Sequence, residues 1–187
     1  YDQDGDLDVA LIGSPDGANR QSKLYRNDGN GLFTDSGVPL AALYDGAVRW
    51  GDYDKDGDLD WFVSSIYDPA GIPVAGQGIT GNRLYRNDGA GVYTDVSAAA
   101  GVREGFWGWG SCFADFDLDG WLDIYHVNGM PFGNHPVFGA DPARLYWNRG
   151  DGTFDQQSEL RGVADTGQGR GIACFDYDRD GDLDIYL

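Results

Sequence analysis

Short runs of apolar and β-favouring residues, separated by turn residues, recur along the chain. In one unit, Ala47–Gly51 leads into an acidic loop and Leu59–Ser65 leaves it as an apolar run. Further on, Arg83–Asn87 and Val92–Val96 flank an Asn-Asp-Gly turn, which favours a β-hairpin. No stretch shows a long 3.6-residue periodicity, and residues 98–100 could form at most one helical turn. The pattern therefore predicts four short strands per unit and an all-β fold.

Two sequence signatures alternate along the chain and reveal an internal repeat. The acidic loop Asp-x-Asp-x-Asp-Gly-x-x-Asp occupies residues 52–60, 115–123 and 176–184, and the chain opens inside a further copy at residues 2–8. A Leu-Tyr-x-Asn signature begins at Leu24, Leu84 and Leu145, which gives a period of about 61 residues. Four strands at this period are typical of a β-propeller blade. A β-helix or solenoid is the alternative, but its coils would repeat every 20 to 30 residues or so.

The length of the chain limits how many blades it can hold. Three periods fit into 187 residues, whereas propellers typically close with about 4–8 blades. We therefore expect a β-propeller fragment with about three four-stranded blades in a single partial domain, residues 1–187. The blade-like units are predicted near residues 1–46, 47–109 and 110–170, with the start of a further unit at 171–187. The remaining blades of a longer propeller are then expected partners of this chain.

The charge balance excludes two classes of partner. The chain has 31 acidic and 13 basic residues, a formal net charge of −18, whereas nucleic acids and anionic lipid surfaces need a basic footprint. No apolar run approaches the roughly 18 residues of a membrane-spanning helix. We therefore expect no nucleic-acid partner and no membrane insertion. Because 41% of the residues are hydrophobic, the chain is expected to fold.

The two cysteines are predicted to be buried free thiols. Cys112 lies three residues before Asp115, and Cys174 lies two residues before Asp176. In strands of period 2, this difference places the two side chains on opposite faces.

The acidic loops have a direct chemical interpretation as calcium sites. Calcium takes about 6–8 oxygen ligands, and carboxylates at alternating positions of a tight loop converge on one point. An EF-hand would need an acidic residue at the twelfth position, where this chain has Val63, His126 and Leu187. Magnesium prefers to keep several waters and zinc prefers His or Cys, so Ca²⁺ is the expected cofactor.

The predicted ligands come from three complete loops and one truncated loop. In the complete loops they are Asp52, Asp54, Asp56, Asp58 and Asp60; Asp115, Asp117, Asp119, Trp121 and Asp123; and Asp176, Asp178, Asp180, Asp182 and Asp184. The seventh position of each loop (Asp58, Trp121 and Asp182) would contribute its backbone carbonyl. The truncated loop offers Asp2, Asp4, Asp6 and Asp8. Because extracellular Ca²⁺ modules typically bind with Kd of order 10⁻⁴–10⁻³ M, such sites predict a secreted or surface-exposed protein.

The residues that carry these signatures resemble a known family. The Gly-Trp-Gly-x-x-Phe-x-Asp run at residues 108–115 and the Leu-Tyr-Arg-Asn run at residues 24–35 resemble FG-GAP or VCBS repeats of integrin-α-like β-propellers. More narrowly, they resemble the cartilage acidic protein group and its bacterial ASPIC/UnbV relatives. The resemblance implies a seven-bladed, usually secreted propeller with Ca²⁺ between strands 1 and 2 of a blade and a role in adhesion. The literal Gly-Ala-Pro tripeptide is missing, and Tyr93 replaces the usual Phe.

A partner surface is predicted on the rim opposite calcium. The connections there vary between units, and variable loops on a repeated scaffold often carry recognition. A protein or glycan partner is expected there, and the candidate contacts are Trp107, Trp109, Phe132, His135 and Phe138. Their alternative role is packing between blades. No catalytic constellation is visible, so we expect an adhesion or recognition module; the alternative is the propeller part of a Ca-dependent secreted enzyme such as a polysaccharide lyase or lipase.

Overall fold

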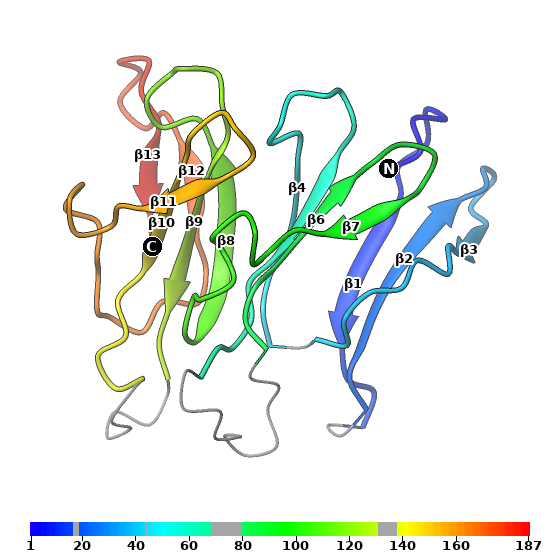
Figure 1. Ribbon diagram of the computed structural model, residues 1–187, viewed down its shortest axis with the longest axis horizontal. Helices are drawn as coiled ribbons and strands as arrows, with labels where there is room; N and C mark the ends of the chain where they lie inside the picture. The colour runs from blue at the N-terminus through cyan, green and yellow to red at the C-terminus, as the bar shows by residue number, and fades with distance from the viewer. Residues whose placement is uncertain (17–18, 44, 69–79, 131–137) are drawn as a thin grey trace.

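The computed structural model describes residues 1–16, 19–43, 45–68, 80–130 and 138–187, and Figure 1 shows their arrangement. The regular structure in these residues consists of strands in antiparallel sheets, which confirms the all-β prediction. No helix among the described residues combines the length and apolar character that a membrane span requires.

The strands form consecutive sheets in chain order. The first sheet contains β1 (Val9–Gly13), β2 (Gln21–Asn27) and β3 (Phe33–Asp35). The second contains β4 (Val48–Gly51), β5 (Asp60–Val63), β6 (Arg83–Asn87) and β7 (Tyr93–Asp95). The third contains β8 (Gly108–Ala114), β9 (Asp123–Asn128), β10 (Arg144–Asn148) and β11 (Phe154–Gln156). The last pairs β12 (Ala173–Phe175) with β13 (Asp184–Tyr186).

The second and third sheets are up-and-down meanders, and the first strand of each lies beside the first strand of the following sheet. Within the second and third sheets every strand pairs with its neighbours in sequence. Strand β4 lies against β8, and β8 lies against β12. This stacking of meanders is the blade arrangement of a β-propeller, so the fold is a β-propeller fragment, as the repeat predicted.

The blades are held together by side chains that alternate between the two faces of each sheet. Phe62 on β5 points toward the third blade and joins a buried cluster with Ile124. Its neighbour Trp61 points the other way and packs with partly buried Ala10 and Ile12 of the first blade. Because both faces of β5 are covered, its residues are all buried, and the strand is a continuous apolar run after Asp60.

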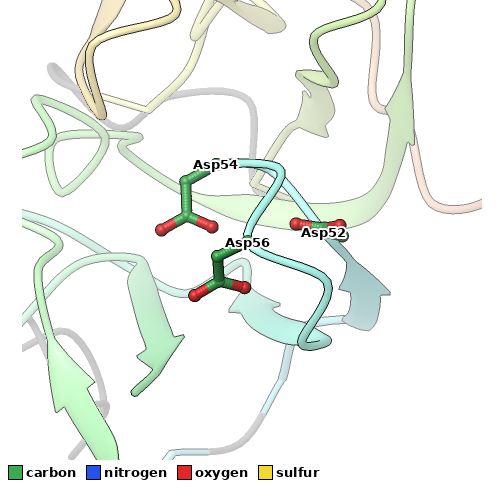
Figure 2. A group of neighbouring side chains, drawn as sticks. All are labelled: Asp52, Asp54 and Asp56. Carbon is green, nitrogen blue, oxygen red and sulfur yellow. The ribbon is translucent and has the colours of Figure 1, made fainter. Parts of the chain in front are cut away.

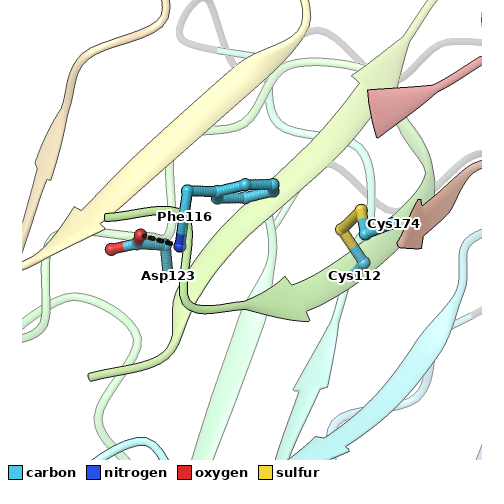
Figure 3. The surroundings of a disulfide bond; sticks show 4 residues. All are labelled: Cys112, Phe116, Asp123 and Cys174. Carbon is cyan, nitrogen blue, oxygen red and sulfur yellow. Dashed lines mark hydrogen bonds between the residues drawn. A yellow bond between two sulfur atoms is a disulfide. The ribbon is translucent and has the colours of Figure 1, made fainter. Parts of the chain in front are cut away.

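The prediction of two free thiols is wrong, because Cys112 and Cys174 form a disulfide (Figure 3). Cys112 pairs across β8–β9 with Tyr125, whereas Cys174 pairs across β12–β13 with Ile185. Ile185 occupies the position of Ile124 in its own repeat, whereas Cys112 pairs with Tyr125, the next residue. The two cysteines are therefore one position apart in equivalent strands, and their side chains lie on opposite faces. In a stack of blades, opposite faces of neighbouring sheets are the ones that meet. The inferred orientation was therefore correct, and the conclusion drawn from it was not.

Candidate metal centres

Three acidic loops each connect the first and second strands of a blade, at the same end of the sheets (Figure 1). Figure 2 shows Asp52, Asp54 and Asp56 projecting from the loop between β4 and β5. Each of these residues offers one carboxylate oxygen, and the three oxygens lie within 4.8 Å of one another. Equivalent clusters of three form in the other complete loops: Asp115, Asp117 and Asp119 between β8 and β9, and Asp176, Asp178 and Asp184 between β12 and β13.

The loop backbone turns sharply at two positions, which brings the alternating carboxylates together. Lys55 at the fourth position has φ 60°, and Gly57 at the sixth has φ 94°. The positive φ recurs at the fourth position of the other loops, in Gln3, Leu118 and Arg179. Only the sixth position is a glycine, so the sequence indicated one of the two left-handed residues and gave no sign of the other.

Carboxylates of each loop also cap its own backbone. Asp52 Oδ2 accepts a hydrogen bond from Gly57 N–H (3.2 Å), and Asp56 Oδ1 accepts one from Asp58 N–H (2.9 Å). The third blade repeats both contacts, from Gly120 N–H to Asp115 Oδ2 (2.8 Å) and from Trp121 N–H to Asp119 Oδ1 (2.8 Å). These bonds fix the loop shape and leave other carboxylate oxygens facing the centre.

Two of those remaining oxygens, both in the second blade, are available to a ligand. Asp52 Oδ1 and Asp54 Oδ1 are buried, and neither has a hydrogen-bond partner. A buried carboxylate oxygen without a partner is costly, and burial raises the pKa of Asp54 above its usual value. In the last blade, the charge of Asp180 is the main cause that raises the pKa of Asp178. A bound cation would satisfy the oxygens and offset the repulsion, so the donor set fits a hard metal ion.

The aspartate at the ninth position has a structural role in the second and third blades that was not predicted from the sequence. Asp60 is fully buried, and it accepts Tyr53 N–H at Oδ2 (3.0 Å) and Asn87 N–H at Oδ1 (2.9 Å). Asp123 repeats the pattern with Phe116 N–H (3.2 Å) and Asn148 N–H (2.8 Å). Burial raises the pKa of Asp60 to about 7 and that of Asp123 to about 6.

This aspartate therefore clamps the start of the loop to the third strand of its blade. Asp60 and Asp123 do not join the clusters of three, whereas the equivalent Asp184 does. Their predicted ligand role stays a prediction, as does the use of the carbonyls of Asp58, Trp121 and Asp182.

The remaining predicted ligands lie at the start of the chain. Asp2, Asp4, Asp6 and Asp8 belong to the described residues, and no cluster of three forms from them. Asp8 has the clamping role of Asp60, since it accepts Asn27 N–H at 2.8 Å and lies beside the N-terminal nitrogen of Tyr1.

The structure corrects the role expected for two of the aromatic residues. Trp107 and Phe138 are 5% and 1% exposed and pack edge to face with ring centroids 5.3 Å apart. They belong to a buried cluster, so their side chains pack the interior instead of facing a partner. Trp109 is partly buried under the Arg170 guanidinium, 4.4 Å from its ring centroid. Phe132 and His135 lie outside the described residues.

Comparisons with known proteins place the chain in a family. Residues 1–63, 74–126 and 137–187 match a family model described as an FG-GAP-like repeat. The chain belongs to the FG-GAP-like repeat family. The matched FG-GAP-like segments contain every predicted metal ligand.

Two similar proteins share only part of their length with these FG-GAP-like repeats. Human cartilage acidic protein 1 is 39% identical over 92 residues, which are 49% of this chain and 12% of that protein. The chain thus spans about an eighth of that relative. A solved structure of an Agrocybe aegerita lectin, described as recognising non-reducing terminal N-acetylglucosamine, has 18% sequence identity and a TM-score of 0.47. That alignment covers 95% of this chain and 46% of the lectin chain.

A hollow on the opposite rim was not foreseen from the sequence. This surface hollow has a volume of about 490 Å³, and its lining includes Tyr67, Ala98, Gly101, Arg103 and Glu104. The Tyr67 hydroxyl donates to Glu104 Oε1 at 3.2 Å. None of these residues belongs to a motif. Tyr67 lies in the connection between β5 and β6, the other four lie in the connection between β7 and β8, and connections on this rim were predicted to carry recognition.

Proposed function

We propose that this chain is a calcium-stabilised, extracellular recognition module of the β-propeller type. The proposal that the loops bind calcium rests on the convergence of three carboxylate oxygens within 4.8 Å of one another in each complete loop. In the second blade, this convergence coincides with buried oxygens that have no partner. The clusters contain only aspartates, and carboxylate oxygens suit a hard cation such as Ca²⁺.

Bound calcium would increase the stability of the folded protein. Two unit charges about 4 Å apart repel by roughly 1–4 kcal/mol at effective dielectric constants of 80 to 20, so the clustered carboxylates would oppose folding unless a cation offset their repulsion. Each loop also joins the two inner strands of a blade, for example β4 and β5. A cation at the loop centre would therefore hold the inner edge of the blade together.

An extracellular setting is supported by the disulfide and by the chemistry of the loops. Disulfides persist in oxidising compartments and are rare in the cytosol. The Cys112–Cys174 bond joins two blades, so it is part of the packing of the propeller. Calcium is also abundant enough outside cells to fill sites of modest affinity.

The recognition surface we propose is the rim opposite the metal loops. Tyr67, Arg103 and Glu104 surround the hollow there and offer an aromatic ring and both signs of charge. Such a mixture suits a polar ligand, either a glycan or a peptide. These three residues replace the buried Trp107 and Phe138 as the candidate contacts in the described part of the rim.

Further blades are the partners we propose for the exposed sheet faces. Val9 and Leu11 of β1 are 42% and 38% exposed, although the equivalent Trp61 and Val63 of β5 are fully buried against the first blade. At the other end of the stack of sheets, Tyr186 on β13 is 71% exposed, although the equivalent Phe62 is buried. Neighbouring blades would cover both faces in the way that the described blades cover each other.

Thermal unfolding with and without metal tests the calcium part. The melting temperature is measured in millimolar Ca²⁺, in the same concentration of Mg²⁺, and in a chelator. We expect Ca²⁺ to raise it by several degrees and Mg²⁺ to raise it much less. Superimposed curves in Ca²⁺ and chelator would rule out a stabilising role.

A binding screen tests the recognition part. The protein, loaded with Ca²⁺, is applied to arrays of glycans and of extracellular proteins, and an Arg103→Ala, Glu104→Ala double variant serves as the comparison. Saturable binding that the double variant loses supports the proposed rim. Binding that the variant retains would place the contact elsewhere, and product formation from a bound polysaccharide would favour an enzyme.

A further inference from the structure

Asn148 connects the metal loop of its own blade to the metal loop of the preceding blade. Its side-chain Nδ2 donates to the carbonyl of Tyr53, in the loop of the second blade, at 2.9 Å. The same nitrogen donates to the carbonyl of Leu122, in the loop of the third blade, at 3.0 Å. The backbone N–H of Asn148 donates to Asp123 of that third-blade loop at 2.8 Å. One buried residue thus contacts two loops.

The contact to Tyr53 lies next to predicted metal ligands of the preceding loop. Tyr53 stands between Asp52 and Asp54, the first two predicted ligands. Its N–H is held by Asp60 of its own loop at 3.0 Å, and its carbonyl is held by Asn148 of the next blade. A continuous hydrogen-bonded path therefore runs from Asp60 through Tyr53 and Asn148 to Asp123.

The same link recurs one blade earlier, so it belongs to the repeat. Asn87 Nδ2 donates to the carbonyl of Tyr1, in the first loop, at 3.1 Å, and its backbone N–H donates to Asp60 at 2.9 Å. Asn27, at the equivalent position of the first blade, donates from Nδ2 to Leu7 in its own loop at 3.1 Å.

A second contact joins consecutive loops at their outer edge. The residue at the fourth position of one loop reaches the sixth and seventh positions of the next. Gln3 Nε2 donates to the carbonyl of Gly57 at 2.8 Å and to Asp58 Oδ1 at 2.6 Å. Lys55 Nζ lies over the ring of Trp121, 4.1 Å from its centroid. The left-handed backbone at this fourth position therefore occurs where a side chain crosses between blades.

We propose that neighbouring calcium loops bind their ions with positive cooperativity, and that Asn148 is the positioning residue that couples the loop at 52–60 to the loop at 115–123. The inference rests on the proposed calcium function. Fixing the Tyr53 peptide in one loop also fixes the side chain of Asn148, and with it Leu122 and Asp123 in the next loop. The second loop is then already ordered when it binds, so its binding costs less conformational entropy.

Calorimetric titration with CaCl₂ tests the coupling in the full chain. Asp178→Ala removes a ligand from the last loop and provides the background. In that background, Asp54→Ala leaves only the loop at 115–123, and Asp117→Ala leaves only the loop at 52–60. The product of these two association constants is compared with the constant for filling both loops. Positive coupling makes the constant for filling both loops larger than this product. We expect the ratio of that constant to the product to be about five or more.

Two further variants assign the coupling to the contacts between blades. Asn148→Ala should bring the ratio close to one, whereas the matched change Asn27→Ala should leave it unchanged because Asn27 contacts neither loop. Lys55→Ala, at an exposed position, should lower the ratio without affecting folding. Circular dichroism checks the fold of each variant.

The outcomes separate this inference from the function on which it rests. If the ratio is one in the Asp178→Ala background and each single-loop variant still binds calcium, the coupling is disproved. The proposed calcium sites are then unaffected. A ratio that survives in Asn148→Ala overturns the role assigned to Asn148, whatever the effect of Lys55→Ala. If no variant and no parent binds calcium, the proposed calcium function fails, and the coupling fails with it.

Discussion

Cys112 of β8 and Cys174 of β12 are joined by a disulfide across the boundary between two neighbouring blades. The residues are 62 positions apart in sequence, close to one repeat period, and their Cα atoms are 6.7 Å apart. The bond therefore links the innermost strands of two blades, where β8 and β12 lie side by side. It closes a large loop of chain around the whole outer part of the third blade.

Removing this disulfide should destabilise the protein. Closing a loop of this size restricts the unfolded chain and contributes about 4 kcal/mol in the chain-entropy account, so we expect the Cys112→Ser, Cys174→Ser variant to lose about 2–5 kcal/mol. Urea unfolding of the two proteins, with and without a reducing agent, measures the difference. The reducing agent should shift only the parent protein, and unfolding curves that superimpose would contradict the prediction.

The packing around Gly51 should not tolerate even a single added methyl group. A Cβ built there would lie 2.7 Å from the ring of Phe113 and 3.1 Å from Leu122 of the next blade. Gly51→Ala is therefore expected to lower the free energy of unfolding by about 1–3 kcal/mol, because the blades must move apart. Gly13→Ala is the matched control, since no atom lies within 4 Å of its added Cβ. Equal effects of the two substitutions in urea unfolding would argue against close packing at Gly51.

Asp141 should make stability depend on pH. Burial raises its pKa to about 7, although Trp107 N–H (2.9 Å) and Asn128 Nδ2 (3.0 Å) donate to its carboxylate and Arg144 lies 3.7 Å away. The folded protein thus holds a proton that the unfolded chain releases near its ordinary pKa. The resulting stability is present at low pH and is lost as the pH rises through about 7.

Comparing Asp141→Asn with the parent protein isolates this contribution. Between pH 5 and pH 8, the free energy of unfolding of the parent should fall by about 1–3 kcal/mol more than that of the variant. Other carboxylates titrate in both proteins, so they cancel in the difference. A difference that does not change with pH would show that Asp141 stays ionised in the folded protein.

Removing one metal ligand should remove one calcium ion. Asp117→Ala takes a carboxylate from the cluster of Asp115 and Asp119, and the calcium stoichiometry should fall from three to two. Asp155→Ala is the control, because Asp155 is about half exposed and pairs with Arg149 outside the loops. Equilibrium dialysis with ⁴⁵Ca²⁺ gives the stoichiometry. An unchanged value for Asp117→Ala would exclude this residue as a necessary ligand.

Much of the fold and of the candidate site could be predicted because it depends on local spacing. The Asn-Asp-Gly turn after Arg83–Asn87 predicted the hairpin of β6 and β7, and the alternating aspartates at 52, 54 and 56 converge as expected. The roles of Asp60 and Cys112 could not be predicted in this way. Asp60 is held by a strand 27 residues further on, and Cys112 meets a strand of the next blade.

By itself, the sequence determined the repeat, the strands and the clusters of carboxylates, because each follows from residues a few positions apart. Only the tertiary structure decided which faces of neighbouring blades meet. That choice turned two cysteines on opposite faces into a disulfide, buried Trp107 and Phe138, and placed Asn148 between two metal loops. The physical reason is that these contacts join residues tens of positions apart in sequence, and no local pattern records which side chains will meet there.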